Sequence, residues 1–207
     1  RSFQKASRMN ASPASYRSVF APGLFGGQVI VVTGGGSGIG RCTAHELASL
    51  GAQVVLVGRK PEKLEAVKAE IEAAGGKAAT QAFDIRQEEA VRDAVRAIVA
   101  AFGGIDVLVN NAGITHRSLF IETELAVFRR VMAVNFYGAL HCTQAALPSL
   151  LARHGQIVVL SSLTGFAPLL YRSAYNASKH ALHGLFDTLR MELGGTGVAI
   201  TLACPGF

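Results

Sequence analysis

The chain has 207 residues, about the size of one large domain; half of them are hydrophobic and 16% are charged, which excludes a disordered protein. None of its apolar runs reaches the roughly 18 residues of a membrane-spanning helix, so no integral membrane segment is expected. The net charge of +6 comes mainly from residues 1–28, which carry four basic and no acidic side chains; the remainder is nearly balanced, and nucleic-acid binding is not expected.

Residues 1–27 have neither helical nor strand periodicity and are rich in Ser, Ala and Arg, which predicts a poorly ordered N-terminal leader. An acid-free start with Arg and Ser is also found in transit peptides, although no amphipathic stripe is present. We therefore expect a cytoplasmic protein, with organellar targeting by residues 1–27 as the open alternative. Whether residues 1–8, which precede Met9, are native is also open.

From residue 28 onward, short apolar runs alternate with segments of helical spacing. The predicted strands are 29–32, 53–57, 78–83, 106–109, 156–160 and 198–203. The predicted helices are 39–50, 62–74, 88–102, 124–151 and 173–193. Strands joined through helices form right-handed crossovers and hence a parallel sheet. The sequence therefore predicts an α/β domain over 28–207, a Rossmann-like doubly wound parallel sheet of six strands with helices on both faces.

A glycine-rich turn, Thr33-Gly34-Gly35-Gly36-Ser37-Gly38-Ile39-Gly40, lies between the first predicted strand and helix. Glycines let the backbone approach a pyrophosphate closely, and the free N–H groups at the start of a helix attract anionic oxygens. The position between strand and helix favours a dinucleotide-binding turn over a plain turn.

The second predicted strand ends in Gly58-Arg59, where an NAD-binding domain usually has an acidic residue that binds the adenosine ribose. Gly58 offers no acceptor, whereas the Arg59 guanidinium matches the oxygens of a 2′-phosphate. We therefore expect NADP(H) to be preferred and NAD(H) to be possible. The alternative is that Arg59 is an ordinary solvated loop residue.

Polar residues also follow the third and fourth predicted strands, at the sheet edge where open α/β sheets bind ligands. Asp84 is a candidate acceptor for an adenine amino group, and Asn111-Ala112-Gly113 is a candidate lining for the adenosine half of a cofactor. Ordinary turn residues are the alternative at both places.

The candidate catalytic pair is Tyr175 and Lys179, because a spacing of four places them on one face of a helix. An ammonium group near the phenol favours the phenolate and so suits Tyr175 to donate and accept protons. Ser161 and Ser162, at the end of the preceding strand, are candidates for presenting a hydroxyl to the same pocket.

Over residues 28–207 the chain resembles the short-chain dehydrogenase/reductase family of the Tyr-x-x-x-Lys type. The resemblance rests on the glycine-rich turn, Asn110-Asn111-Ala112-Gly113, Asn135, Ser162, Tyr175-x-x-x-Lys179 and Pro205-Gly206, in the family's order. It implies that Tyr175 is the general acid or base and that Ser162 holds the substrate oxygen. It also implies that Lys179 binds the nicotinamide ribose and that Asn135 anchors a water in a proton relay. Ser161 is the alternative to Ser162, which has the family's spacing to Tyr175.

The resemblance implies a set of cofactor contacts in addition. The expected cofactor-binding residues are Gly34, Ser37, Gly38, Ile39, Gly40, Arg59, Asp84, Ile85, Asn111, Ala112, Gly113, Tyr175, Lys179, Pro205 and Gly206. It further implies a homo-oligomer formed through the long helix and the Tyr-bearing helix. Family members continue beyond Pro-Gly into a seventh strand, so a C-terminally incomplete domain is expected here.

Together these features predict an NADP(H)-dependent oxidoreductase that transfers hydride between nicotinamide and a carbonyl or secondary alcohol. Leu163, Phe166, Leu169 and Leu170, between Ser162 and Tyr175, favour a hydrophobic substrate. The second hypothesis is a non-catalytic nucleotide-binding sensor or scaffold of the same fold. No metal site is expected, because the three cysteines and the histidines lack ligand spacing.

Overall fold

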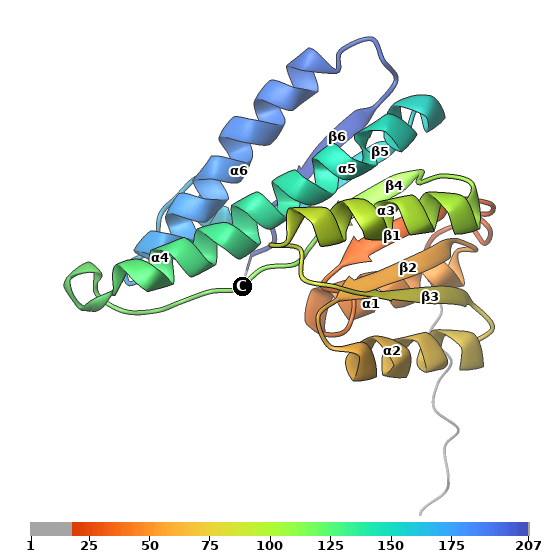
Figure 1. The fold of residues 1–207 in the computed structure, drawn as a ribbon, viewed down its shortest axis with the longest axis horizontal. Coiled ribbons are helices and arrows are strands. Elements are labelled where there is room, and N and C mark those ends of the chain that lie inside the picture. The colour runs from red at the N-terminus through yellow and green to blue at the C-terminus, as the bar shows by residue number, and fades with distance from the viewer. Residues whose placement is uncertain (1–17, 207) are drawn as a thin grey trace, which may run out of the picture.

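The predicted apolar runs form the strands of one parallel sheet in the computed structural model, which describes residues 18–206 (Figure 1). The strands are β1 Val29–Thr33, β2 Gln53–Gly58, β3 Lys77–Ala82, β4 Val107–Asn110, β5 Gln156–Leu160 and β6 Ala199–Ala203. Their order is β3-β2-β1-β4-β5-β6, and every neighbouring pair is parallel. This confirms the predicted doubly wound α/β fold.

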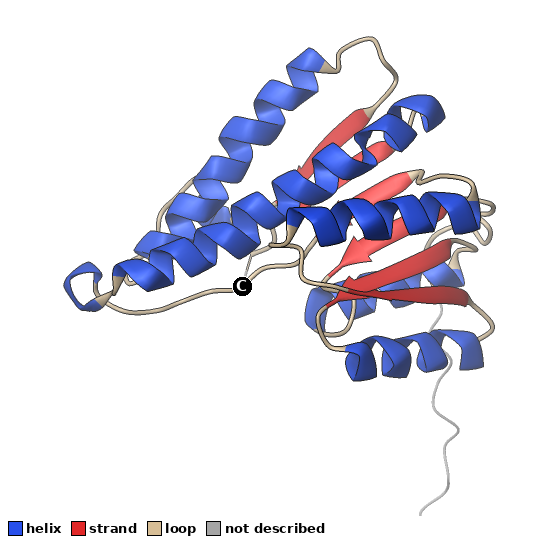
Figure 2. Cartoon of the chain, viewed as in Figure 1, coloured by secondary structure: helices blue, strands red, loops and turns tan. Residues whose placement is uncertain are grey.

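Helices cover both faces of this sheet (Figure 2). They are α1 Gly38–Ser49, α2 Pro61–Ala73, α3 Glu88–Phe102, α4 Leu125–Met132, α5 Gly138–Arg153 and α6 Ser173–Glu192. Alternate residues of β1 face opposite sides: Val31 packs in a core with α3, α5 and α6, while Val32 packs in another with α1 and α2. Both layers bury apolar strand side chains, which explains why the strands read as continuous apolar runs.

The predicted long helix 124–151 is not uniform. It begins as α4, passes through a π-helical turn at Ala133–Tyr137 and continues as α5. In the π turn, the Gly138 N–H bonds to the carbonyl of Ala133, five residues earlier. Two short 3-10 helices, Phe120–Glu122 and Leu163–Gly165, lie in segments for which the sequence predicted no helix or strand. Apolar periodicity does not reveal such local changes of hydrogen bonding.

The described part of the predicted leader, residues 18–27, packs against α1 and the loop after it. The Phe25 N–H donates to the Leu50 carbonyl at 3.0 Å, and the Ser18 hydroxyl donates to Glu46 at 2.6 Å. The Phe25 side chain packs against the core under α1 and α2. The prediction for residues 1–17 lies outside the described residues.

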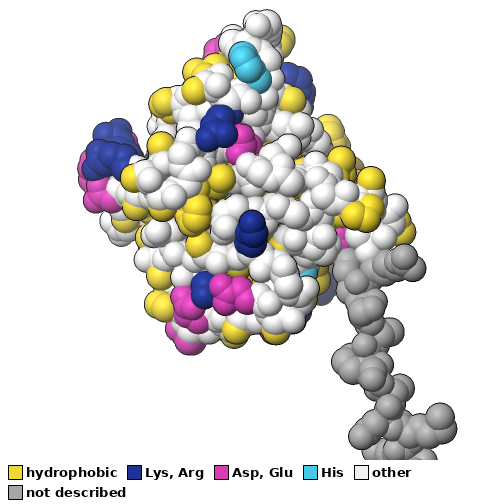
Figure 3. Space-filling model, turned by 90° about the vertical axis from the view of Figure 1, so that its right-hand side faces the viewer, with side chains coloured by type: hydrophobic (Ala, Val, Ile, Leu, Met, Phe, Trp, Pro, Cys, Tyr) yellow, Lys and Arg dark blue, Asp and Glu magenta, His cyan; other side chains and the backbone are white. Residues whose placement is uncertain are grey.

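Two further observations concern the charged side chains on the surface and the apolarity of the helices. On the face seen in Figure 3, basic and acidic side chains are interspersed and form no basic patch. Among residues 18–206, no helix has both the length and the apolarity needed to cross a bilayer.

The strand order reverses between β1 and β4, whose following loops diverge to opposite sides of the sheet. At this switch point a crevice opens at the carboxyl ends of the strands. The glycine-rich turn after β1 and the Asn111 loop after β4 both lie there.

Candidate active site

Two adjoining cavities form a cleft along the carboxyl ends of the strands. The larger is about 450 Å³ and the smaller about 330 Å³. Both are lined by Ile39, Asn111, Gly113 and Ile114, so they meet at the switch point. Most of the expected cofactor-binding residues line one cavity or both; Gly38 and Gly40 line neither.

The glycine-rich turn is held against the Asn111 loop by hydrogen bonds. The Thr33 hydroxyl accepts from the N–H groups of Asn111 and Ala112, each at 3.0 Å, and the Asn111 amide donates to the Thr33 carbonyl at 2.8 Å. A Cβ at Gly40 would lie 2.4 Å from the Gly34 carbonyl oxygen, and Gly34 itself has φ +69°. Glycine is therefore required at both positions by backbone packing.

The start of α1 is suited to an anion. Ser37 occupies the N-cap position with extended backbone, yet its side chain makes no capping hydrogen bond, and the first turn contains no acidic residue. The first N–H groups of this helix are thus left without a side-chain acceptor, as a pyrophosphate site requires. On this observation the turn fits the diphosphate of a dinucleotide.

The far end of the larger cavity is cationic. Arg59, Lys60 and Lys63 line it, and within the described residues none of the three lies within 4 Å of a carboxylate. The sequence predicted Arg59 but missed the two lysines, although Lys60 is its neighbour and Lys63 lies in the first turn of α2. Together they fit a phosphate group.

Asp84 and Ile85, two of the expected cofactor-binding residues, also line the larger cavity. The Asp84 carboxylate is 2.6 Å from the Arg86 guanidinium and also accepts from the Arg86 backbone N–H. The hydrogen bonds from the Arg86 side chain hold the pKa of this carboxyl below its usual range, against the opposing effect of burial. Asp84 is therefore a charged acceptor that is already well supplied with donors.

Tyr175 and Lys179 lie one turn apart in α6 and line the smaller cavity together with Ser162. The Lys179 ammonium is 5.5 Å from the centre of the Tyr175 ring and donates to the Leu160 carbonyl at 2.6 Å. Lys179 is 5% exposed, and burial lowers its pKa from the ordinary 10.5 to about 8. The predicted helix-face pairing is thus present in the structure.

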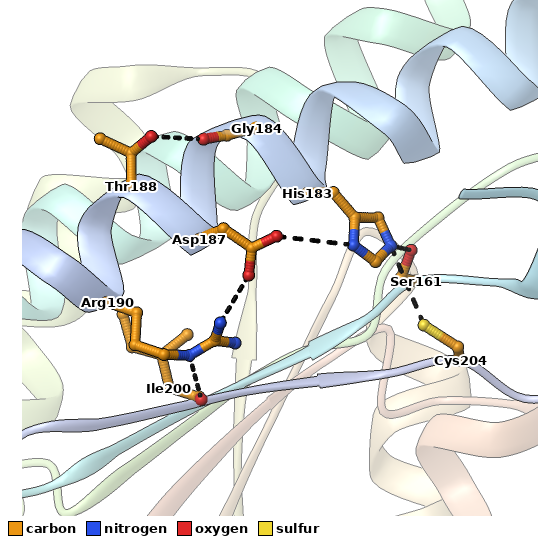
Figure 4. A network of polar contacts seen from close by, with 8 residues as sticks. All are labelled: Ser161, His183, Gly184, Asp187, Thr188, Arg190, Ile200 and Cys204. Carbon is orange, nitrogen blue, oxygen red and sulfur yellow. Dashed lines mark hydrogen bonds and ion pairs between the residues drawn. The ribbon is translucent and has the colours of Figure 1, made fainter. Parts of the chain in front are cut away.

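The two candidate serines have different partners. The Ser161 hydroxyl, which is buried, lies 2.8 Å from Nε2 of His183, as Figure 4 shows. The Ser162 hydroxyl accepts a 3.2 Å bond from the Thr164 N–H and has its own proton to donate. Ser161 is therefore engaged by α6, whereas Ser162 has donor capacity left for a ligand.

His183 is the centre of a small polar network, and the sequence assigned it no role in the site. Its ring lies 3.9 Å from the Cys204 sulfur and 3.9 Å from the Asp187 carboxylate (Figure 4). Phe166 packs edge-on against the same ring. Burial lowers the pKa of His183 and favours the neutral ring. Among residues 18–206 no cluster of three His, Cys, Asp or Glu side chains suits a metal ion.

Asn135 is buried in the π turn and lies behind the cleft. Its side-chain oxygen accepts from the Ile114 N–H at 2.8 Å, and its amide nitrogen donates to the Ile114 carbonyl and to Ser178, each at 2.9 Å. Both polar atoms of the side chain are thus bonded to protein groups, and they hold in place the loop that lines both cavities.

Sequence reasoning missed Ile114, Thr115 and Arg172 in the smaller cavity. The Arg172 guanidinium donates to the Thr115 hydroxyl at 2.5 Å and lies 5.9 Å from the centre of the Tyr175 ring. Arg172 stands three residues before Tyr175, and residues three apart on a helix lie on the same face. The sequence therefore contained a signal that could have placed Arg172 beside Tyr175. Pro205 and Gly206, which are also expected cofactor-binding residues, complete the lining.

Known proteins are similar to this chain in sequence and in architecture. The family model for short chain dehydrogenase matches residues 28–207. Dehydrogenase/reductase SDR family member 7B of Bos taurus is 39% identical over 186 residues, which cover 86% of this chain and 57% of the relative. The chain thus spans little more than half the length of that relative.

Solved structures give the same result. The citronellol catabolism dehydrogenase of Pseudomonas aeruginosa PAO1 has a TM-score of 0.89 and 42% identity, covering 93% of this chain and 79% of that one. A metagenomic short-chain oxidoreductase in complex with NADP has a TM-score of 0.84 and 40% sequence identity, and the match covers 88% of this chain and 84% of that one. An NAD+-bound xylitol dehydrogenase has a TM-score of 0.86 and 32% sequence identity, and the match covers 89% of this chain and 72% of that one. Similar proteins therefore bind either NADP or NAD+.

Proposed function

This chain belongs to the short chain dehydrogenase family, and from that premise we propose that it is an NADP(H)-dependent oxidoreductase acting on a carbonyl or secondary alcohol. The observation that carries the proposal is the convergence of Ser162, Tyr175 and Lys179 on one cavity. That cavity adjoins a second one whose glycine turn and cationic end fit a phosphorylated dinucleotide.

In the proposed reaction, a nicotinamide cofactor held along the cleft supplies the hydride. Tyr175 donates its phenolic proton to the carbonyl oxygen of the substrate, and Ser162 donates a hydrogen bond to the same oxygen and stabilises its developing negative charge. The product is the secondary alcohol. In the oxidative direction Tyr175 accepts the proton instead.

Lys179 has two tasks in this proposal. Its ammonium group, which is charged below a pKa of about 8, favours the phenolate that remains after proton donation. It also hydrogen-bonds the cofactor ribose. We propose that Asn135 anchors a water of the proton relay, although its side chain is already bonded to Ile114 and Ser178.

The cofactor preference rests on charge. Arg59, Lys60 and Lys63 provide the cations for a 2′-phosphate, and Gly58 at the end of β2 provides no acceptor for a ribose hydroxyl. We propose that NADP(H) is preferred and that NAD(H) binds more weakly. A hydrophobic substrate is favoured by apolar side chains at the mouth, of which Leu170 is 75% exposed.

The test is Tyr175→Phe, which removes the transferred proton and keeps the ring. We expect loss of NADPH oxidation with every carbonyl compound that the unmodified chain reduces, while NADPH still binds, as measured by its fluorescence. Turnover at the unmodified rate would contradict the assigned acid. If the unmodified chain binds NADPH but oxidises it with no carbonyl, the sensor or scaffold hypothesis replaces the enzyme.

A further inference from the structure

We propose that Arg172, assisted by Arg117, selects carbonyl substrates that carry a carboxylate or phosphate group. The inference rests on the proposed function and specifies its substrate class: an apolar molecule with the reacting carbonyl near Ser162 and Tyr175 and an anionic group at Arg172. The anionic group is held in place and takes no part in the chemistry.

The first observation is the position of Arg172. It lines the smaller cavity beside Tyr175, immediately before the start of α6. Its guanidinium is fixed from two sides, by the Thr115 hydroxyl at 2.5 Å and by the face of the Tyr175 ring, whose centre is 5.9 Å away. This cation is thus held next to the reacting phenol, where a substrate passes.

The second observation is that Arg172 is not neutralised. Six of the eleven arginines among residues 18–206 lie within 4 Å of a carboxylate: Arg41, Arg86, Arg92, Arg96, Arg153 and Arg190. Arg172 has no such partner among residues 18–206, and no Asp or Glu lines the smaller cavity. Thr115 occupies one of the five N–H donors of its guanidinium, so the planar pair needed for a carboxylate or phosphate stays available.

The third observation is a second arginine, Arg117, on the loop that is hydrogen-bonded to the loop before Arg172. The Arg117 guanidinium lies 5.6 Å from the centre of the Tyr171 ring, and the two loops are joined by a 3.0 Å bond from the Ser118 N–H to the Tyr171 carbonyl. Arg117 is exposed and also lacks a carboxylate partner in the described part of the chain. Of these two arginines, Arg172 lines the smaller cavity and Arg117 does not, but both lie on loops that are hydrogen-bonded to each other. Together they make this region attractive to anions.

The neighbouring apolar side chains fix the rest of the substrate. Leu163 lines the same cavity, and Leu169 and Leu170 directly precede Tyr171 and Arg172. An apolar chain can cover these side chains while its anionic end reaches the guanidinium. A neutral ketone would use only the apolar part, so the anionic group adds specificity.

The experiment compares matched substrates. A series of medium-chain oxo carboxylic acids with different spacing between carbonyl and carboxylate is assayed beside the corresponding methyl esters, and alkyl phosphates bearing a ketone form a second arm. We expect kcat/KM for the best acid or phosphate to exceed that of its neutral counterpart by about tenfold to a hundredfold. The arm with the larger ratio identifies the anion.

The variants assign the preference to a residue. Arg172→Met should reduce the ratio of acid to ester at least about tenfold, Arg172→Lys should restore part of it, and Arg117→Met should reduce it less. Arg96→Met removes the same charge from an exposed position of α3 and should leave the ratio unchanged. If Arg172→Met fails to bind NADPH, Arg117→Met and the fall of the ratio with rising salt decide instead.

Two failures are distinguishable. An active enzyme that uses acid and ester equally, or an Arg172→Met variant that keeps the ratio, overturns this inference and leaves the proposed function intact. If no substrate is reduced, the proposed function fails. Calorimetric titration of acid and ester into the NADP-saturated protein then still tests the anion site, and equal affinities overturn it.

Discussion

At the scale of single residues, the chemistry of the cleft depends on which side chains already have a hydrogen-bond or ion-pair partner within the protein and which do not. The Ser161 hydroxyl is hydrogen-bonded to His183, while the neighbouring Ser162 accepts one bond and has a proton to donate. In the larger cavity, the Asp84 carboxylate is paired with Arg86, while Arg59 has no carboxylate within 4 Å among the described residues. Within each pair, the two residues therefore differ in the capacity that is left for a ligand.

Lys179 allows a test by pH. Its pKa is about 8 in the folded protein and near 10.5 when exposed, so between these values the unfolded chain binds more protons and stability rises with pH. We expect the free energy of unfolding of the unmodified chain, relative to Lys179→Met, to increase by up to ~3 kcal/mol from pH 7 to pH 10.5. Urea unfolding of both proteins at several pH values measures this difference. A difference that stays flat, or falls, would show that the ammonium is not destabilised by burial.

Arg59 is tested through the choice of cofactor. Arg59→Ala should weaken NADPH binding about tenfold or more and change NADH binding little, because only NADPH has the 2′-phosphate. Arg96→Ala, which removes an equal charge from an exposed residue that does not line this cavity, is the matched control. Fluorescence titrations of both cofactors give the affinities. An unchanged preference for NADPH in Arg59→Ala would leave Lys60 and Lys63 as the phosphate-binding cations.

At the scale of elements, the site is built from the ends of helices and strands. The turn after β1 and the loop after β4 are bonded through Thr33, and the loop after β4 is fixed in turn by Asn135 in the π turn. Alteration of any one element thus reaches the shared lining of both cavities.

Two helical glycines make a matched pair for this scale. A Cβ at Gly40 would lie 2.4 Å from the Gly34 carbonyl, so Gly40→Ala should push α1 away from the turn, cost about 1–3 kcal/mol of stability and abolish cofactor binding. At Gly184 in α6 a Cβ meets nothing within 4 Å, and Gly184→Ala should stabilise by up to about 1 kcal/mol. Thermal or urea unfolding with NADPH titration compares them. Equal effects of the two changes would contradict the packing argument.

At the scale of the whole molecule, one sheet supports both halves of the cleft. The predicted homo-oligomer through the long helix (α4, the π turn and α5) and α6 stays a proposal, which sedimentation velocity tests. Two leucines of these helices, Leu150 and Leu182, are 0% and 1% exposed and belong to the internal core. Leu140, Leu147, Leu151 and Leu185 are half-buried and remain available for such an interface.

The sequence by itself determined the succession of strands and helices along the chain, the glycine-rich turn and the pairing of Tyr175 with Lys179. These features depend on local periodicity, on steric freedom at glycine and on a fixed helical spacing, and each can be read from neighbouring residues. Apolar runs on both faces of the strands likewise required a covered parallel sheet.

Only the tertiary structure decided which polar groups are already paired. The contacts of Ser161 with His183, of Asn135 with Ile114 and of Arg172 with Thr115 join residues 22, 21 and 57 positions apart. Lys60 and Lys63 likewise line the same cavity as Asp84, which is more than 20 positions away in the sequence. Hydrogen bonding, burial and ion pairing depend on which segments meet in space, and no periodicity in one segment encodes its partner in another.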